Sequence, residues 1–400
     1  MSNAYAEIFH PPGAKSFMAA STLARLALPM TTIGIVAMLS QTHGQYWLAG
    51  AVSALFAIAN AFIAPRISKW VDAKGQAAVL RPATLVTLLA LLGLAAAAHQ
   101  DWPIWTFFVC ALLAGVMPSM AALSRARWAE MFRGKPQLHT AFSFESIVDE
   151  IAYICGPVFG IGLSVSLFPE AGVLSSAFFL AIGSFWLSSQ KATEPPTKNQ
   201  SGLITSSVLN YPAVWIVALM FAGMGCIVGT AEVAVVALTE AQAQKGAATY
   251  ILSANAVGSF LVGIVFGTMS FKSSLTQRLL YAALIATLMT LPLPFTNSLG
   301  LLAFLYFLSG ASLSPTFISG FGLIEHTVPS SQLTEGITYA QTGLLLGFAF
   351  GSTATGWVVD AYGPSSGFWV AVGGGVAALL TIAGGYKHLS SVSTQQASAA

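Results

Sequence analysis

The chain has 400 residues, of which 56% are hydrophobic and 8% are charged, and its formal net charge is +2. Soluble domains carry about 25% charged residues, so this chain cannot cover a surface that faces water, and its mean hydropathy of +0.75 indicates lipid as its main solvent. The small net charge gives no indication of nucleic-acid binding, and the sequence has neither a phosphate-binding loop nor a Cys or His spacing typical of a metal site, so we expect no cofactor and no metal.

Twelve apolar stretches follow one another along the chain, separated by Gly, Pro and charged residues. Each is long enough to cross a membrane as a helix, which takes about 17–25 residues. The expected spans are 18–40, 46–68, 79–98, 103–123, 140–167, 171–189, 210–238, 247–270, 279–295, 298–320, 336–359 and 366–386. The first stretch is interrupted by Arg25 and Pro29 and lacks a small-residue cleavage site, so we interpret it as a retained helix rather than a signal peptide.

The longest polar break in the chain contains Pro195 and Pro196 and divides the spans into six plus six. The expected fold is therefore an all-α membrane protein with twelve transmembrane helices in two six-helix bundles. Its parts are an N-terminal bundle in 1–189, a linker in 190–209, a C-terminal bundle in 210–390 and a disordered tail in 391–400.

Basic residues are distributed unevenly among the connections between the spans. If the N-terminus is cytoplasmic, the connections that face outward carry one basic residue, Lys245, of the 16 Lys and Arg residues in the chain. The positive-inside rule then places the linker and both termini in the cytoplasm. No organelle signal is found, so we expect a multi-pass protein of the bacterial cytoplasmic (inner) membrane.

The two halves contain similar short sequences. The fifth span has GPVFG at 156–160 and the eleventh has GFAFG at 347–351, while AGVMPSMAAL at 114–123 resembles SGASLSPTFI at 309–318. Both pairs occur in corresponding spans and at nearly the same offset. The repeat predicts two pseudo-symmetric halves, with a substrate site at their interface, as in many secondary transporters.

The connection after the second span reads PRISKWVDAKGQAAVLRP, residues 65–82. It resembles a pattern of the major facilitator superfamily at the same place: Asp72 and Gly75 match, and Ser68 stands where the family has its first Gly. The resemblance implies that Asp72 pairs with a basic residue or a helix N-terminus of the other half and latches the outward-facing state. The alternative is a charged turn that water solvates.

The fifth span resembles a second pattern of this family, the antiporter motif that is typical of exporters and especially of drug:proton antiporters. Gly156, Pro157 and Gly160 match its GPxxG core. Pro157 removes a backbone hydrogen bond and permits a bend, and the glycines permit close helix packing, which we expect at the interface between the halves. Ordinary helix packing is the alternative interpretation.

Three carboxylates precede this motif in the same span. Glu145 and Asp149 lie on one helix face, and Glu150 is rotated from Asp149 by about 100°. Ionised groups inside a membrane need partners. The candidates are Arg25 in the first span and Arg125 and Arg127 at the end of the fourth. Such a network either ties three helices together or has a role in proton or substrate binding.

Glu232 is the one acid well within the spans of the second half. Three glycines precede it in the seventh span, at 223, 225 and 229. A lone carboxylate inside a membrane indicates a functional site by default. The alternative is a side chain that reaches the outer interface beside Lys245.

The resemblance implies a secondary active transporter that moves a small molecule by alternating access, with the proton gradient as its energy source. The motif of the fifth span favours efflux by proton antiport, in which protonation of Asp149 or Glu232 would favour one facing state. The alternative is a proton-coupled importer (symporter) of a sugar, an organic acid or another nutrient. The chain has no soluble output domain and no catalytic cluster, so we expect neither a sensor nor an enzyme. The expected partners are the substrate, protons and membrane lipid, with the protein functional as a monomer.

Overall fold

The computed structural model describes residues 2–43, 46–197, 208–244, 247–269, 271, 273–296 and 298–397. In the N-terminal half the helices are α1 (Ser2–Glu7), α2 (Ala14–Arg25), α3 (Ala27–His43), α4 (Tyr46–Lys74), α5 (Gln76–His99), α6 (Trp105–Ala114), α7 (Met120–Phe132), α8 (Gln137–Ser166), α9 (Ala171–Ser189) and the short turn η1 (Lys191–Thr193). In the C-terminal half they are η2 (Val208–Asn210), α10 (Pro212–Ala241), α11 (Ala247–Phe266), α12 (Leu275–Thr290), η3 (Leu293–Phe295), α13 (Leu299–Thr327), η4 (Ser330–Gln332), α14 (Leu333–Tyr362), η5 (Pro364–Gly367) and α15 (Phe368–Ala397).

The twelve expected spans all correspond to helices of the structure. Within the described residues, ten segments are long and apolar enough to cross a membrane, and the fourth and eighth spans contribute the shorter apolar helices at Trp105–Ala114 and Tyr250–Phe266. The chain is therefore a multi-pass membrane protein with the expected all-α fold.

The first expected span lies in one candidate membrane span, Ala14–His43, which is interrupted at Leu26 and so consists of α2 and α3. Pro29 lies in the first turn of α3. Because proline has no N–H, it cannot bond to the carbonyl of Arg25, four residues earlier, and the helix is interrupted there. The break places Arg25 at the end of α2, within the bundle, where its side chain is 6% exposed.

The fourth span is also interrupted. α6 ends at Ala114, and α7 begins only at Met120, after Pro118. The side-chain amide of Asn60 on α4 donates to the carbonyl oxygens of Gly115 at 3.2 Å and Met117 at 2.8 Å, so backbone groups that the break exposes find partners. Ser119 then caps α7, accepting from the backbone nitrogen of Ala122.

The repeat between the halves appears as matching helix contacts. In the N-terminal half α8 packs on α3: a Cβ on Gly156 would lie 2.6 Å from Cγ of Pro29. In the C-terminal half α14 packs on α10: a Cβ on Gly347 would lie 1.9 Å from the carbonyl oxygen of Ala222. GPVFG therefore serves packing within one half, and its expected place at the interface between the halves is wrong.

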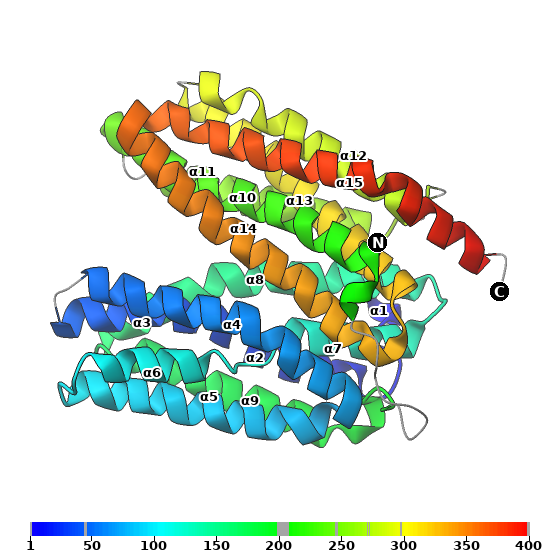
Figure 1. Ribbon diagram of the computed structural model, residues 1–400, viewed down its shortest axis with the longest axis horizontal. Coiled ribbons are helices and arrows are strands. Elements are labelled where there is room, and N and C mark those ends of the chain that lie inside the picture. The colour runs from blue at the N-terminus through cyan, green and yellow to red at the C-terminus, as the bar shows by residue number, and fades with distance from the viewer. Residues whose placement is uncertain are drawn as a thin grey trace.

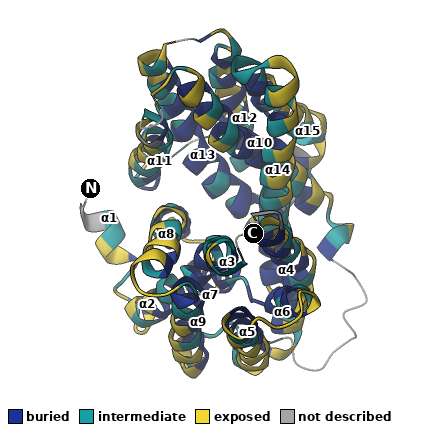
Figure 2. Ribbon diagram, turned by 90° about the vertical axis from the view of Figure 1, so that its left-hand side faces the viewer, coloured by how far each residue is buried: buried dark blue, intermediate teal, exposed yellow. Residues whose placement is uncertain are grey.

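Figure 1 shows the two halves as separate layers of helices, with α2–α9 below and α10–α15 above. Residues 190–197 lie at the same end of the molecule as α1 and the end of α15, and we call this the linker end. The opposite end, where α5 is followed by α6 and α10 by α11, is the far end. Figure 2 looks along the helices from the far end and shows buried residues inside each half and exposed ones outside.

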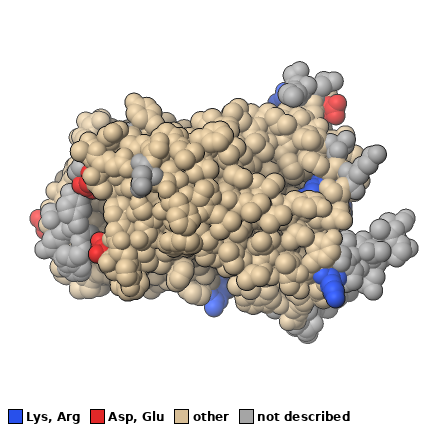
Figure 3. Space-filling model, turned by 90° about the horizontal axis from the view of Figure 1, so that it is seen from above, with Lys and Arg blue, Asp and Glu red and all other residues tan. Residues whose placement is uncertain are grey.

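Most of the surface between the two ends is uncharged. On the face that Figure 3 shows, a broad belt is almost free of charge, with one basic side chain at its lower edge and most of the other charged side chains toward the ends. Large apolar side chains are exposed on this belt, among them Phe62, Leu89 and Phe178, which are 57%, 62% and 60% exposed. This pattern suits a protein surrounded by lipid.

The expected linker is described only in part, since residues 198–207 lie outside the described residues. Its first part packs on the N-terminal half: Glu194 Oε1 accepts from the backbone nitrogen of Ala77 at 2.9 Å, at the N-terminus of α5. α15 continues to Ala397, so helix extends into the segment expected as a tail, residues 391–400.

Candidate functional site

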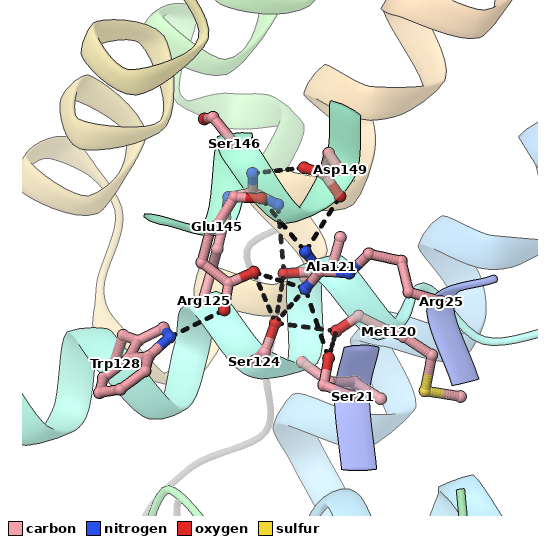
Figure 4. Close-up of polar contacts among 12 residues, drawn as sticks. Ser21, Arg25, Met120, Ala121, Ser124, Arg125, Trp128, Glu145, Ser146 and Asp149 are labelled. Carbon is pink, nitrogen blue, oxygen red and sulfur yellow. Dashed lines mark hydrogen bonds and ion pairs between the residues drawn. The ribbon is translucent and has the colours of Figure 1, made fainter. Parts of the chain in front are cut away.

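Four charged side chains meet inside the N-terminal half, where α2, α7 and α8 come together (Figure 4). Arg25 pairs with Glu145, Nη2 to Oε2 at 2.5 Å, and with Asp149, Nη1 to Oδ1 at 3.1 Å. Arg125 pairs with the other oxygen of Asp149, Nη2 to Oδ2 at 2.6 Å. We call these four residues the charge cluster. As expected from the sequence, arginines of the first and fourth spans neutralise two acids of the fifth.

Neutral donors complete the surroundings of Glu145, whose side chain is fully buried. Ser124 Oγ donates to Oε2 at 2.9 Å, and Trp128 Nε1 donates to Oε1 at 2.8 Å. Arg25 also donates to Ser124 Oγ at 2.6 Å. A buried carboxylate is tolerated only when its oxygens are paired in this way, so Glu145 is held as a structural anchor for α7 and α8.

The charge cluster also reaches the other half of the molecule. The guanidinium carbon of Arg125 lies 4.2 Å from the ring centre of Phe321 on α13, a cation–π arrangement. Asp149, which pairs with this arginine, is 24% exposed, whereas Glu145 is not exposed at all. The Asp149–Arg125 side of the cluster therefore lies near the boundary between the halves.

Arg127 does not belong to the charge cluster, and the expectation that it would pair with these acids is wrong. Its Nε donates to Gln76 Oε1 at 2.7 Å, and Nη1 donates to Thr193 Oγ1 at 2.6 Å. Nη2 donates to the carbonyl oxygen of Leu187 at 3.0 Å. These acceptors lie at the start of α5, in the linker and at the end of α9, so Arg127 attaches the linker to the N-terminal half.

Glu150 points away from both arginine pairs, as its rotation on the helix predicts. Its Oε1 lies 2.7 Å from Ser259 Oγ on α11, in the other half. Among the described residues it forms no ion pair. Of the three acids of the fifth span, Glu150 is the one that contacts the C-terminal half without a cation beside it.

Glu232 lies on α10 with an exposed side chain. The described residues give it no ion pair. Lys245, the partner considered from the sequence, lies outside the described residues. The structure therefore keeps Glu232 apart from the charge cluster and does not place it with the other acids.

Asp72 lies across the boundary from a helix N-terminus of the other half. Its Oδ2 accepts from the backbone nitrogen of Glu335 at 2.8 Å, and Oδ1 accepts from that of Thr334 at 3.3 Å. These nitrogens belong to the first turn of α14, where a carboxylate satisfies free N–H groups and the helix dipole. One turn earlier on α4, Ser68 Oγ lies 2.8 Å from Thr338 Oγ1.

Gly75 ends α4 with a φ of +94°. Its N–H still donates to the carbonyl of Val71 at 2.8 Å, and the left-handed conformation turns the chain into α5. A side chain here would be strained, and its Cβ would also lie 2.9 Å from Glu194 Oε1. The glycine that matches the family pattern thus permits both the turn and the contact with the linker.

A second set of contacts joins the halves between α8 and the end of α11. Ser143 Oγ donates to the carbonyl of Gly263 at 2.5 Å, and Thr140 Oγ1 donates to that of Gly267 at 2.8 Å. Tyr5, from α1, donates to the carbonyl of Ile264 at 2.9 Å. These carbonyls lie at the C-terminal end of α11, where carbonyl groups run out of intrahelical donors. Gly263 also accepts from the backbone nitrogen of Gly267 at 3.1 Å. Side chains of the first half therefore help to cap a helix of the second.

Sequence reasoning missed this second set, together with the hydrogen bond from Ser119 Oγ to Gln341 Oε1 at 2.6 Å. Ser, Thr and Tyr near helix ends are common in any membrane protein, and their sequence positions do not say which helix they face. The one indication was the count of hydroxyl side chains at the start of the fifth span, where Thr140, Ser143 and Ser146 occur within seven residues.

The comparisons with known proteins agree with this architecture. The family model described as Major Facilitator Superfamily matches residues 16–299 and 231–396. None of the curated proteins matches the sequence. The human organic anion transporter MFSD10 (TETRAN) is 14% identical, with a TM-score of 0.72 over 93% of this chain and 100% of that chain.

Two further solved structures are similar to a comparable degree. A bacterial homologue of the iron transporter ferroportin, in an outward-facing state, is 13% identical with a TM-score of 0.72 and covers 94% of this chain and 99% of its own. The transporter FucP, in the outward conformation, is 16% identical with a TM-score of 0.67 and covers 92% of this chain and 97% of its own. At these identities the likeness shows the fold. Since the family model matches well over half of the chain, and the fold agrees, the chain is a membrane transporter that belongs to the major facilitator superfamily.

Proposed function

We propose that the protein exports a small molecule from the cytoplasm in exchange for protons by alternating access. The observation that carries the proposal is the placement of the contacts between the halves. They join the linker-end part of α4 to that of α14, and the linker-end part of α8 to that of α11. Toward the far end the two halves diverge in Figure 1.

These contacts are of a kind that can break and form again. They are single hydrogen bonds between side chains and helix termini, and each net bond stabilises by about 0.5–1.5 kcal/mol, or somewhat more where a charge takes part. Several of them together hold one facing state, and a few kcal/mol of differential binding reverses the preference. In this proposal the linker end is the closed cytoplasmic side, which the excess of basic residues in its connections supports.

The acids at the boundary support coupling to protons. Two arginines and three carboxylates (Glu145, Asp149 and Glu150) lie within one region of α2, α7 and α8, which leaves one carboxylate more than the number of cations. An ionised carboxylate without a paired cation is costly inside a membrane, and binding a proton removes its charge. The antiporter-type GPVFG motif on the same helix favours export over import.

Flux measurements with the purified protein in lipid vesicles test this proposal. Candidate substrates come from comparing the metabolites in the medium of cells that lack the protein and cells that overproduce it. Proton antiport predicts that a candidate accumulates against its gradient on the acidic side of the vesicle membrane. Accumulation on the alkaline side would establish proton symport instead. A flux that is indifferent to the pH gradient would refute proton coupling altogether.

Orientation requires a separate test. Single cysteines in the linker end, at Lys135, and in the far end, at Asp101, should react differently with a membrane-impermeant maleimide in intact bacterial cells. The proposal predicts labelling at 101 only. Labelling at 135 alone would place the linker end outside and would reverse the proposed direction.

A further inference from the structure

Three oxygen–oxygen contacts connect Glu150 to the second half. Glu150 Oε1 lies 2.7 Å from Ser259 Oγ, and this oxygen lies 2.9 Å from Ser314 Oγ on α13. Ser314 Oγ in turn lies 2.8 Å from the backbone carbonyl oxygen of Ser259. Both serines are buried, with 0% and 1% of their surface exposed. All three distances are in the range of O–H···O hydrogen bonds.

Three hydrogen bonds need three hydrogens, and the two serines supply only two. A serine hydroxyl has one hydrogen, a carbonyl oxygen has none, and an ionised carboxylate has none. If Glu150 were ionised, one of the three contacts would place lone pairs of two oxygens against each other at less than 3 Å in a buried site. If Glu150 is protonated, every contact receives one hydrogen.

We propose that Glu150 is protonated in this conformation and that its proton is the coupling proton of the transport cycle. The carboxylic acid donates to Ser259 Oγ, Ser259 donates to Ser314 Oγ, and Ser314 donates to the carbonyl of Ser259. The proton thereby joins α8 of the first half to α11 and α13 of the second. This assigns the coupling proton to Glu150, in place of Asp149 or Glu232.

The charges around Glu150 agree with the assignment. On α8 itself the neighbouring titratable groups are Asp149 and Tyr153, and both cations of the region, Arg25 on α2 and Arg125 on α7, pair with Asp149. Neither cation pairs with Glu150. A second negative charge on Glu150 would therefore lie beside Asp149 without compensation.

The other helices packed against α8 bring no cation closer. The sequence of α11 contains neither Asp, Glu, Lys, Arg nor His, and neither does that of α9. On α3 the titratable residue is His43, at its far end. On α13 they are Tyr306, Glu325 and His326, more than two turns from Ser314 in either direction. α1, which also packs on α8, contributes Tyr5 and Glu7 and no cation among its described residues. From all these helices the structure gives Glu150 one polar contact, with the hydroxyl of Ser259.

Protonation of Glu150 is also coupled to the movement of the two halves. When the linker end opens, α11 moves away from α8. Ser259 then no longer accepts from Glu150, and the two serines no longer screen Glu150 from water. Water then reaches the carboxyl group, its O–H bond breaks, and the proton passes to water on the linker side. The resulting carboxylate lacks the third hydrogen, so the closed set of hydrogen bonds cannot form again until a proton returns from the far end. This step depends on the proposed transport cycle, whereas the protonated state in the present conformation does not.

Infrared spectroscopy of the protein reconstituted in lipid tests the assignment without a known substrate. A protonated carboxylic acid in a membrane protein gives a C=O stretching band separate from that of carboxylates and amides. At neutral pH we expect this band in the native protein and in Glu130→Gln, whose exposed acid on α7 serves as the matched control. We expect its loss in Glu150→Gln. A band that Glu150→Gln leaves intact would overturn the proposal.

A second variant keeps the test decisive if Glu150→Gln does not fold. Ser259→Ala removes the acceptor of the acid hydrogen but keeps the carboxyl group, so the band should remain and move to higher frequency, as for a less strongly hydrogen-bonded acid. An unshifted band would show that the acid lies elsewhere. Failure of the transport proposal gives a different result, because flux would then ignore the pH gradient while the band and its loss in Glu150→Gln would persist.

Discussion

The carboxylate of Asp72 on α4 accepts a hydrogen bond from the backbone nitrogen of Glu335 at 2.8 Å, which joins the first half of the molecule to the N-terminus of α14 in the second. The family resemblance of the loop around Asp72 pointed to such a partner. The contact can exist only while the linker ends of α4 and α14 are together, so its strength contributes directly to the balance between facing states.

Asp72→Asn should shift this balance toward the state in which the linker end is open. Asparagine still accepts one hydrogen bond but has no charge to interact with the helix dipole. The closed linker end should lose about 0.5–2 kcal/mol of stabilisation, which changes the ratio of the two facing states about 2- to 30-fold. Distances between spin labels placed at the far ends of α4 and α14 would measure this shift in population. Asp101→Asn is the control, since Asp101 is 85% exposed at the far end. Equal distance distributions in Asp72→Asn and the native protein would contradict the latch.

Tyr5→Phe should loosen the second contact between the halves. The ring would keep its tilted packing on Phe144, at 6.3 Å between centres, while the hydrogen bond to the carbonyl of Ile264 would be lost. We expect faster hydrogen exchange of the backbone amides at 263–268, because the end of α11 loses one of its caps. Tyr250→Phe, at the exposed beginning of the same helix, should leave the exchange unchanged. Unchanged exchange in Tyr5→Phe would show that the hydroxyl does not hold α11.

The glycines of GPVFG allow a steric test. A Cβ on Gly156 would lie 2.6 Å from Cγ of Pro29, whereas a Cβ on Gly162, six residues later on α8, meets nothing within 4 Å. Gly156→Ala should destabilise the protein by about 1–3 kcal/mol, since α8 would be pushed away from α3. Gly162→Ala should have no such effect or should stabilise the helix slightly. Thermal unfolding in detergent measures both, and equal midpoints would show that α3 and α8 separate without penalty.

The charge cluster could be predicted from the sequence because the membrane restricts its members. Glu145 and Asp149 lie too deep in a span to face water, and Arg25 and Arg125 are among few cations at a similar depth, so pairing followed from the cost of unpaired charge. The role of Arg127 could not be predicted, because three of its partners are carbonyl or neutral side-chain oxygens at the end of α9 and in the linker.

The spans and the division into halves could be predicted because they depend on local sequence. Hydropathy marks each span, and Gly, Pro and charged residues mark its ends. The interruption of the fourth span could not be predicted, although Pro118 was visible, because a proline inside a spanning helix is often tolerated. Here the carbonyls freed by the break find Asn60, which comes from another span. The contacts of Ser259 and Ser314 with Glu150 likewise depend on how the two halves meet, which no local pattern in either half specifies.

Glu145→Gln should lower stability more than it alters coupling. The side chain accepts from Ser124, Trp128 and Arg25, and an amide can neither accept on both ends nor compensate the arginine. We expect the free energy of unfolding to fall by about 1–3 kcal/mol, and no further, because Asp149 still pairs with Arg25. Thermal unfolding measures it against Asp360→Asn, an exposed acid at the end of α14. A stability equal to that of the native protein would show that Glu145 is not the anchor of this region.

Transport by the Asp149 and Glu150 variants at different pH values separates pairing from proton exchange. Asp149→Asn leaves Arg125 without its anionic partner and should reduce the rate at every pH, while the ratio of rates at acidic and alkaline pH stays as in the native protein. Glu150→Gln places an amide N–H donor where the acid hydrogen lies, so the contact with Ser259 should form at every pH and the rate should lose its dependence on pH. Counterflow of a transported candidate in vesicles without a pH gradient measures both rates. The two carboxyl groups are adjacent on one helix, but Asp149 pairs with the arginines and Glu150 contacts Ser259, so the comparison separates their roles. If pH dependence were lost in Asp149→Asn and retained in Glu150→Gln, the coupling proton would belong to the charge cluster.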